Sequence, residues 1–110
     1  MPLRFKDGFY MATIRDLQKR AWENKINHHF NTTNVEREFC LLEAEVSEAY
    51  LSWLRREKGL DLELADVAIY LFGLAEMNNI DLEEAIETKM KINEQRKYKK
   101  VNGVFIKDEN

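Results

Sequence analysis

The sequence predicts an all-α, four-helix bundle-like domain. Two observations lead to this fold class. Apolar residues recur at spacings of three and four along most of the chain, and helix-breaking residues are scarce, with one proline and four glycines in 110 residues. The composition, 45% hydrophobic and 34% charged, is that of a folded protein with one core. We therefore expect residues 1–110 to form a single domain.

The first two helices are predicted over residues 9–25 and 35–54. In the first, apolar residues share one stripe: Tyr10, Ile14, Leu17 and Ala21. The second follows Thr33, which is expected to be the N-cap, and Glu36 would complete a capping box. Its predicted core stripe consists of Phe39, Leu42, Val46, Ala49 and Trp53.

The third and fourth helices are predicted over residues 60–78 and 82–98. From Leu64 to Ala75 the third is apolar on nearly every side, so we expect it to be buried in the bundle or between subunits. The fourth begins after Asp81, an expected N-cap. The remaining residues, 99–110, are expected to be irregular or packed on a partner, although their Asn-Gly pair could form a tight hairpin turn.

Charge and cysteine content narrow the function classes. A formal net charge of −3 does not indicate a nucleic-acid-binding protein, so no nucleic acid partner is expected. The single cysteine, Cys40, cannot form an internal disulfide and is expected to be a small core residue. No apolar N-terminal stretch resembles a signal sequence or a membrane span, so we expect a cytoplasmic protein without a membrane partner.

One aspartate interrupts the apolar third helix. Asp66 lies where burial is expected, so a cation should meet it, because an unpaired buried carboxylate costs several kcal/mol. Glu63 lies three residues earlier on the same helix face. An exposed first turn is the alternative interpretation, since acidic residues are favoured near helix N-termini.

The second helix carries a matching pair, Glu45 and Glu48, three residues apart. If the second and third helices are antiparallel around a turn near residues 55 and 56, the two pairs bring four carboxylates to one place. Four clustered acids repel one another unless divalent cations neutralise them, and all-oxygen ligation favours Mg²⁺, with Mn²⁺ as the alternative. Glu38 and Glu43 are expected to be ordinary solvated residues.

The fourth helix carries a stripe that becomes basic towards its end: Lys89, Asn93 and Arg96. Such a stripe suits a polyphosphate, although cations are also favoured in the last turns of any helix. In the first helix, Trp22 could stack on a nucleobase or pack in the core. Further candidates for base or sugar recognition follow it: Asn24, Lys25, His28 and His29.

Three motifs together resemble the MazG-like, all-α nucleoside triphosphate pyrophosphohydrolase superfamily: "EAEVSEAY", "ELADV" and "KMKINEQR". The resemblance covers roughly residues 38–97 and follows the family pattern ExxE, ExxD, KxxxNxxR. It implies a MazG-type domain that cleaves a nucleoside triphosphate, with Mg²⁺, to a monophosphate and pyrophosphate, as in nucleotide-pool house-cleaning. Ser47, where glycine is common, and Ala44, where many members have a glutamate, depart from the family.

The resemblance also assigns roles to residues. It implies metal ligation, and with it catalysis, by Glu45, Glu48, Glu63 and Asp66. It implies phosphate contacts by Lys89, Asn93 and Arg96, with Trp22 as a substrate-binding candidate. Together with the apolar third helix, it implies a homodimer or homotetramer, often with sites completed by a neighbouring chain. The alternative is a catalytically silent helical interaction module in which these acids and bases pair as structural salt bridges; a nucleic-acid-binding helical domain is a third hypothesis and ranks last.

Overall fold

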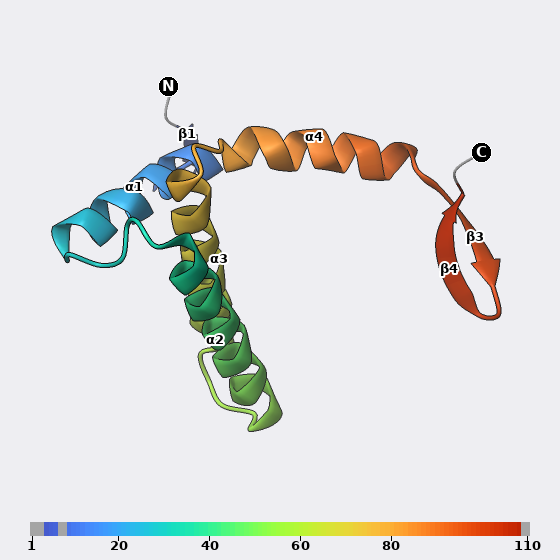
Figure 1. The fold of residues 1–110 in the computed structure, drawn as a ribbon, viewed down its shortest axis with the longest axis horizontal. Coiled ribbons are helices and arrows are strands. Elements are labelled where there is room, and N and C mark those ends of the chain that lie inside the picture. Colours follow the sequence, from blue (N-terminus) through green and yellow to red (C-terminus); the bar gives the residue numbers. More distant parts are fainter. Residues whose placement is uncertain (1–3, 7–8, 109–110) are drawn as a thin grey trace.

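The protein is mostly helical, and its computed structural model describes residues 4–6 and 9–108, with side chains from residue 11 onward. Four helices and two antiparallel strand pairs are present in these residues (Figure 1). The elements are β1 (Arg4–Lys6), β2 (Phe9–Met11), α1 (Ile14–Asn27), α2 (Val35–Leu54), α3 (Leu60–Met77), α4 (Leu82–Gln95), β3 (Lys97–Val101) and β4 (Val104–Asp108). No helix within the described part of the chain is both long and apolar enough to cross a bilayer.

The first helix begins at Ile14 rather than at residue 9. Residues 9–11 instead form β2, which pairs with β1. Thr13 then caps the helix, because its hydroxyl accepts a hydrogen bond from the Asp16 backbone N–H at 3.1 Å and the Asp16 carboxylate accepts one from the Thr13 N–H at 3.1 Å. This capping box fixes the start of α1 and overrides the apolar spacing that predicted a longer helix. The side chain of Tyr10, assigned to the helix stripe, lies outside the described side chains.

The bounds predicted for α2 are confirmed, and those for α3 differ by a single residue at its end. The capping residue of α2 was predicted wrongly. Asn34, not Thr33, is the N-cap, and its side chain accepts a hydrogen bond from the Arg37 N–H at 3.0 Å. The turn between α2 and α3 reverses the chain through Arg56 (φ 54°) and Gly59 (φ 98°), so the two helices lie antiparallel.

The C-terminal segment is a β-hairpin, so the expectation of an irregular tail is wrong. Asp81 caps α4 as predicted, accepting a hydrogen bond from the Glu84 N–H at 3.2 Å, but the helix ends at Gln95. The turn residues Asn102 and Gly103 both have positive φ, 51° and 81°, as in the tight turns that suit the twist of a hairpin. The Asn-Gly pair therefore decides the structure of residues 97–108.

Three helices pack together and the fourth extends away from them. In Figure 1, α2 and α3 lie side by side, α1 crosses one end of α3, and α4 carries the hairpin outward. The start of α4 is attached to α1 through Arg15, whose guanidinium lies 2.6 Å from Asp81 and 3.2 Å from Glu83. The radius of gyration is 17.5 Å, against about 13 Å for a compact domain of this length. A single chain thus does not close the expected four-helix bundle.

Much of the predicted core is exposed in this single chain. In α3 the described residues that are buried lie near its end, at Gly73, Leu74 and Ala75. The expectation that α3 is buried on every side is therefore wrong for one chain. On α2 the prediction holds for Ala49, whereas other members of the predicted stripe are exposed: Phe39, Val46 and Trp53. The expected core position of Cys40 is also wrong, because this residue is exposed.

Candidate functional site: a carboxylate cluster beside a cavity

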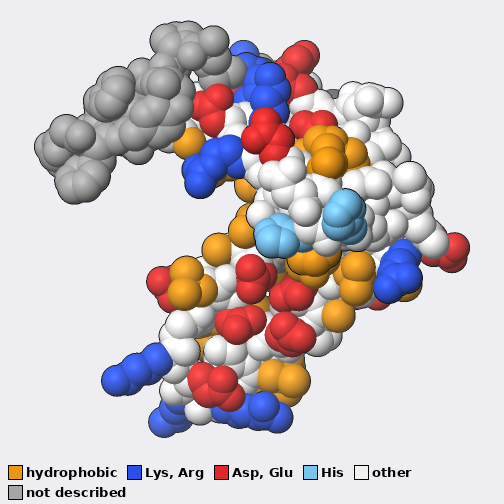
Figure 2. Space-filling view, turned by 90° about the vertical axis from the view of Figure 1, so that its left-hand side faces the viewer, with side chains coloured by type: hydrophobic (Ala, Val, Ile, Leu, Met, Phe, Trp, Pro, Cys, Tyr) orange, Lys and Arg blue, Asp and Glu red, His pale blue; other side chains and the backbone are white. Residues whose placement is uncertain are grey.

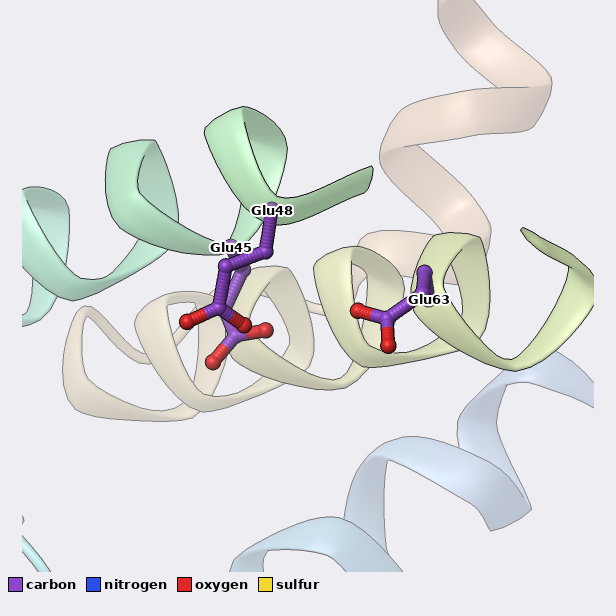
Figure 3. Close-up of side chains that lie close together, drawn as sticks. All are labelled: Glu45, Glu48 and Glu63. Carbon is purple, nitrogen blue, oxygen red and sulfur yellow. The ribbon is translucent and has the colours of Figure 1, made fainter. Parts of the chain in front are cut away.

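Three of the predicted carboxylates converge where α2 and α3 lie antiparallel. Glu45, Glu48 and Glu63 each place one carboxylate oxygen so that all three atoms lie within 4.8 Å of one another (Figure 3). Glu45 and Glu48 come from neighbouring turns of α2, and Glu63 comes from the first turn of α3. The turn at residues 55–59 sets this register, and three of the four carboxylates that were expected to meet around a turn near residues 55 and 56 do so.

Asp66 is adjacent to this cluster but is exposed, so its predicted burial is wrong for a single chain. It lines the same cavity as Glu45, and its negative charge is among the causes that raise the pKa of Glu45. Asp66 and the three clustered glutamates form no ion pair with a lysine or arginine in residues 11–108. We refer to Glu45, Glu48, Glu63 and Asp66 as the acidic cluster.

Glu45 is the electrostatic centre of the acidic cluster. Burial raises its pKa above the ordinary value of 4.5, and the charges of Glu48, Asp66 and Glu63 and a hydrogen bond with Glu48 raise it further. The other three acids therefore all act on this one carboxylate. A cation bound here would offset the negative charges that surround Glu45.

Replacing Glu45 with Gln should make the metal-free protein more stable at neutral pH. Because its pKa is raised in the folded state, Glu45 opposes folding once it ionises, so wild-type stability should fall relative to the variant as pH rises from about 4 to 7. Urea unfolding in EDTA at several pH values measures the difference. Glu43→Gln, which removes an exposed charge of α2 outside the cluster, is the matched control. A difference that is constant across this pH range would contradict the expectation.

A cavity of 720 Å³ opens beside the cluster, between α1, α2 and α3. This volume is within the range of small-molecule sites, roughly 300–1,000 Å³. In Figure 2 acidic side chains gather over the α2–α3 part of the molecule, and the two histidines lie at the edge of that region. The lining residues come from α1, the loop that follows it, α2 and α3: Ala21, Asn24, Lys25, His29, Phe30, Asn31, Arg37, Glu38, Leu41, Glu45, Asp66, Ile69 and Tyr70.

A buried ion pair forms part of the cavity lining. The Lys25 ammonium lies 2.6 Å from a Glu38 carboxylate oxygen, and Glu38 is fully buried. The other carboxylate oxygen accepts a hydrogen bond from the Asn31 amide at 3.3 Å. Gly73 makes room for the pair, since a Cβ there would lie 3.0 Å from Glu38 and 3.2 Å from the Lys25 stem. The prediction that Glu38 is a solvated residue is therefore wrong.

The ion pair and the acidic cluster face a common tyrosine. The Lys25 ammonium lies 5.8 Å from the centre of the Tyr70 ring. Burial raises the pKa of Tyr70, and the nearby charges of Glu45, Glu38 and Asp66 contribute to the shift. Sequence reasoning missed Glu38 and Tyr70. A signal was present, because Glu38 precedes Glu45 by two helical turns and thus shares its face of α2.

The predicted phosphate-binding residues are not on this cavity. Lys89 and Asn93 are exposed on α4, and the half-buried Arg96 is the C-cap of that helix, where its guanidinium donates to the Asn93 amide oxygen at 3.3 Å. Lys89 lines a separate, shallower groove along α4. Trp22 is half-buried on α1 and is not among the cavity-lining residues, whereas Asn24, Lys25 and His29 are. Within one chain, the acidic residues therefore lie together, whereas Lys89, Asn93 and Arg96 lie apart from them.

Fold and site together define a mostly helical protein with an acidic cluster beside a ligand-sized cavity that Glu45 and Asp66 help to line. Comparison of the chain with models of known protein families, with curated proteins and with solved structures finds no match. The chemical interpretation therefore rests on the motifs and on this geometry.

Proposed function

We propose that this protein is a Mg²⁺-dependent nucleoside triphosphate pyrophosphohydrolase of the MazG-like type, which cleaves a ribo- or deoxynucleoside triphosphate to the monophosphate and pyrophosphate. The observation that carries the proposal is the convergence of the two ExxE carboxylates with Glu63 of ExxD, beside a ligand-sized cavity that Asp66 helps to line. Hydrolysis of damaged or surplus nucleotides in a cytoplasmic nucleotide pool would be the corresponding role.

The acidic cluster fits a hard divalent cation. Its donors are all carboxylate oxygens, the ligands that Mg²⁺ and Mn²⁺ prefer, and they have no cationic side chain as partner in the described residues. Burial raises the pKa of Glu45, and the negative charges of the neighbouring acids raise it further. Glu45, Glu48, Glu63 and Asp66 would hold the metal, which supplies charge neutralisation at the phosphate oxygens when bound.

A carboxylate of the acidic cluster and the residues of the cavity have separate roles, in proton transfer and in nucleoside binding. A carboxylate of the cluster accepts the proton of the attacking water, a role that a carboxylate with a raised pKa performs better than an ordinary one. The cavity between α1, α2 and α3 receives the nucleoside. There, Asn24 offers an amide that makes no hydrogen bond with the described side chains, and Phe30 and Tyr70 contribute aromatic rings to the lining.

The phosphate contacts are proposed to come from a second copy of the chain. Lys89, Asn93 and Arg96 project from α4, which extends away from the cavity of its own chain (Figure 1). A homodimer or homotetramer would allow α4 of one copy to approach the acidic cluster of another. It would also complete the helical bundle that one chain leaves open.

The silent interaction module remains the alternative function. Two structural ion pairs favour it: Arg15 with Asp81, and Lys25 with Glu38. It predicts that the acids of the cluster are paired in the same way, and in residues 11–108 they are not. Magnesium dependence separates the two functions, because an interaction module has no use for the ion.

A pyrophosphate-release screen tests the proposal. The wild-type chain is incubated with Mg²⁺ and each of the canonical and several damaged nucleoside triphosphates, and the products are resolved by ion-exchange chromatography. We expect monophosphate and pyrophosphate in equal amounts, with no turnover in EDTA. Release of inorganic phosphate and a nucleoside diphosphate instead would contradict the bond assignment. No turnover of any nucleotide, with no thermal stabilisation by Mg²⁺, would favour the interaction module.

A further inference from the structure

The C-terminal β-hairpin has two chemically different faces. Residues paired across an antiparallel ladder share a face, so Val101, Val104 and Ile106 lie on one side, together with Lys99 and, at the open end of the hairpin, the pair of Lys97 and Asp108. We call this the aliphatic face. The opposite side is formed by two cross-strand pairs: Tyr98 with Lys107, and Lys100 with Phe105. On that side the Lys100 ammonium covers the Phe105 ring at 5.6 Å from its centre.

Nothing in the described part of the same chain covers the aliphatic face. Val104 is 62% exposed, and Val101 and Ile106 are also exposed. In Figure 1 the hairpin lies at the far end of α4, away from α1, α2 and α3. An isolated two-stranded hairpin is at best marginally stable in water, and three exposed β-branched residues on one face need an apolar surface to pack against.

A surface of matching character lies on α2. Phe39, Val46, Tyr50 and Trp53 follow one another at helical spacings of seven, four and three residues, so they form a single stripe, and all four are exposed. We call this the apolar strip. The rings of Tyr50 and Trp53 stack with centres 6.1 Å apart and give the strip a flat aromatic end. The strip occupies a different face of α2 from Glu45, since the stripe through Val46 is turned about 100° from it.

The charges around the apolar strip and around the hairpin are opposite in sign. Residues 35–77, which include α2 and α3, carry ten acidic and four basic residues, whereas residues 89–108, the end of α4 and the hairpin, carry two acidic and seven basic ones. Two copies meeting strip to strip would bring two acidic surfaces together. A hairpin meeting a strip joins opposite charges around an apolar centre, which favours encounter and disfavours the alternative pairing.

We propose that the hairpin is a docking arm, and that in solution its aliphatic face packs on the apolar strip of a second copy of this chain. The exchange is reciprocal, so each copy in a two-fold dimer gives one arm and receives one. The proposal rests on no part of the proposed catalytic function, because neither the metal nor a nucleotide takes part in the contact.

Sedimentation of the full chain in EDTA, without nucleotide, tests the proposal. Wild type should be a dimer at micromolar concentration. The double variant Val104→Asn/Ile106→Asn should weaken dimerisation by about 100-fold, because it places two amides in the apolar contact. The matched control, Phe105→Asn, changes the intervening residue on the opposite hairpin face and should leave the dimer within about threefold of wild type. Circular dichroism checks that the helices are intact.

Mixing two defective variants keeps the test decisive if the hairpin changes merely unfold the arm. Val46→Asn damages the strip and should also give monomers. A mixture of this variant with the double hairpin variant restores one undamaged arm-on-strip contact, so heterodimers should form where neither variant dimerises alone.

Four outcomes would overturn the proposal. They are a monomeric wild type, a double hairpin variant that dimerises normally, an equal loss in Phe105→Asn, and absence of heterodimers in the mixture. A normal dimer in the hairpin variant together with loss in Val46→Asn would assign the strip to a strip-to-strip contact instead.

Discussion

Replacing Glu38 with Gln should destabilise the protein by about 3–5 kcal/mol, the usual result of leaving one partner of a buried ion pair without its counter-charge. Glu38 is fully buried, and its carboxylate lies 2.6 Å from the ammonium of the nearly buried Lys25. The neutral amide keeps the size of the side chain but strands the lysine. Urea unfolding followed by circular dichroism measures the loss, and it should be the same in EDTA and in Mg²⁺, since the pair is separate from the acidic cluster.

A double variant distinguishes loss of the pair from loss of packing. Lys25→Met/Glu38→Gln removes both charges, and it should recover much of the stability lost in Glu38→Gln, because no charge is then left unpaired. Glu36→Gln, an exposed position in the first turn of the same helix, is the control for removing a negative charge from α2. A Glu38→Gln protein as stable as this control would show that the pair contributes little to folding.

Helical spacing and capping residues in the sequence predicted the positions of the helices well. The bounds of α2 follow from helical spacing and the cap at Asp81 from the rules of capping, whereas the approach of Glu45 and Glu48 to Glu63 follows from the position of the turn between the two helices. The errors at Thr33 and at residues 9–11 arose because another cap residue or another pairing was available to the same segment. Asn34 is a better N-cap than Thr33, and pairing with β1 took residues 9–11 from the helix.

Burial was harder to predict than helicity, because apolar spacing identifies a face without saying what covers it. The stripe that includes Phe39, Val46 and Trp53 was assigned to the core, yet one chain leaves it exposed. Glu38 was assigned to solvent for the opposite reason. A charged side chain is buried only where a partner from another part of the chain neutralises it. For Glu38 the partner, Lys25, comes from α1 and the space comes from Gly73 on α3, so its burial depends on tertiary contacts that helical spacing does not predict.

Replacing Asp66 with Asn should lower pyrophosphohydrolase activity by several orders of magnitude while leaving the metal-free fold intact. The isosteric amide removes one negative charge from the acidic cluster, so the metal is bound weakly or in the wrong place, and both water activation and stabilisation of the phosphate charge are lost. In the metal-free protein no penalty is expected, because Asp66 is exposed and forms no ion pair with the described residues. Product formation with Mg²⁺ and a nucleoside triphosphate measures the first effect.

The second effect separates a metal ligand from a structural acid. Thermal unfolding of wild type and Asp66→Asn is compared in EDTA and in Mg²⁺, with Asp61→Asn, an exposed position of the same helix outside the cluster, as the matched control. If Asp66 is a ligand, Mg²⁺ should raise the melting temperature of wild type and of Asp61→Asn but much less that of Asp66→Asn, since an ion stabilises only the state that binds it. A large loss of stability in EDTA would instead mean that Asp66 pairs with a cation across an interface, and would remove it from the metal site.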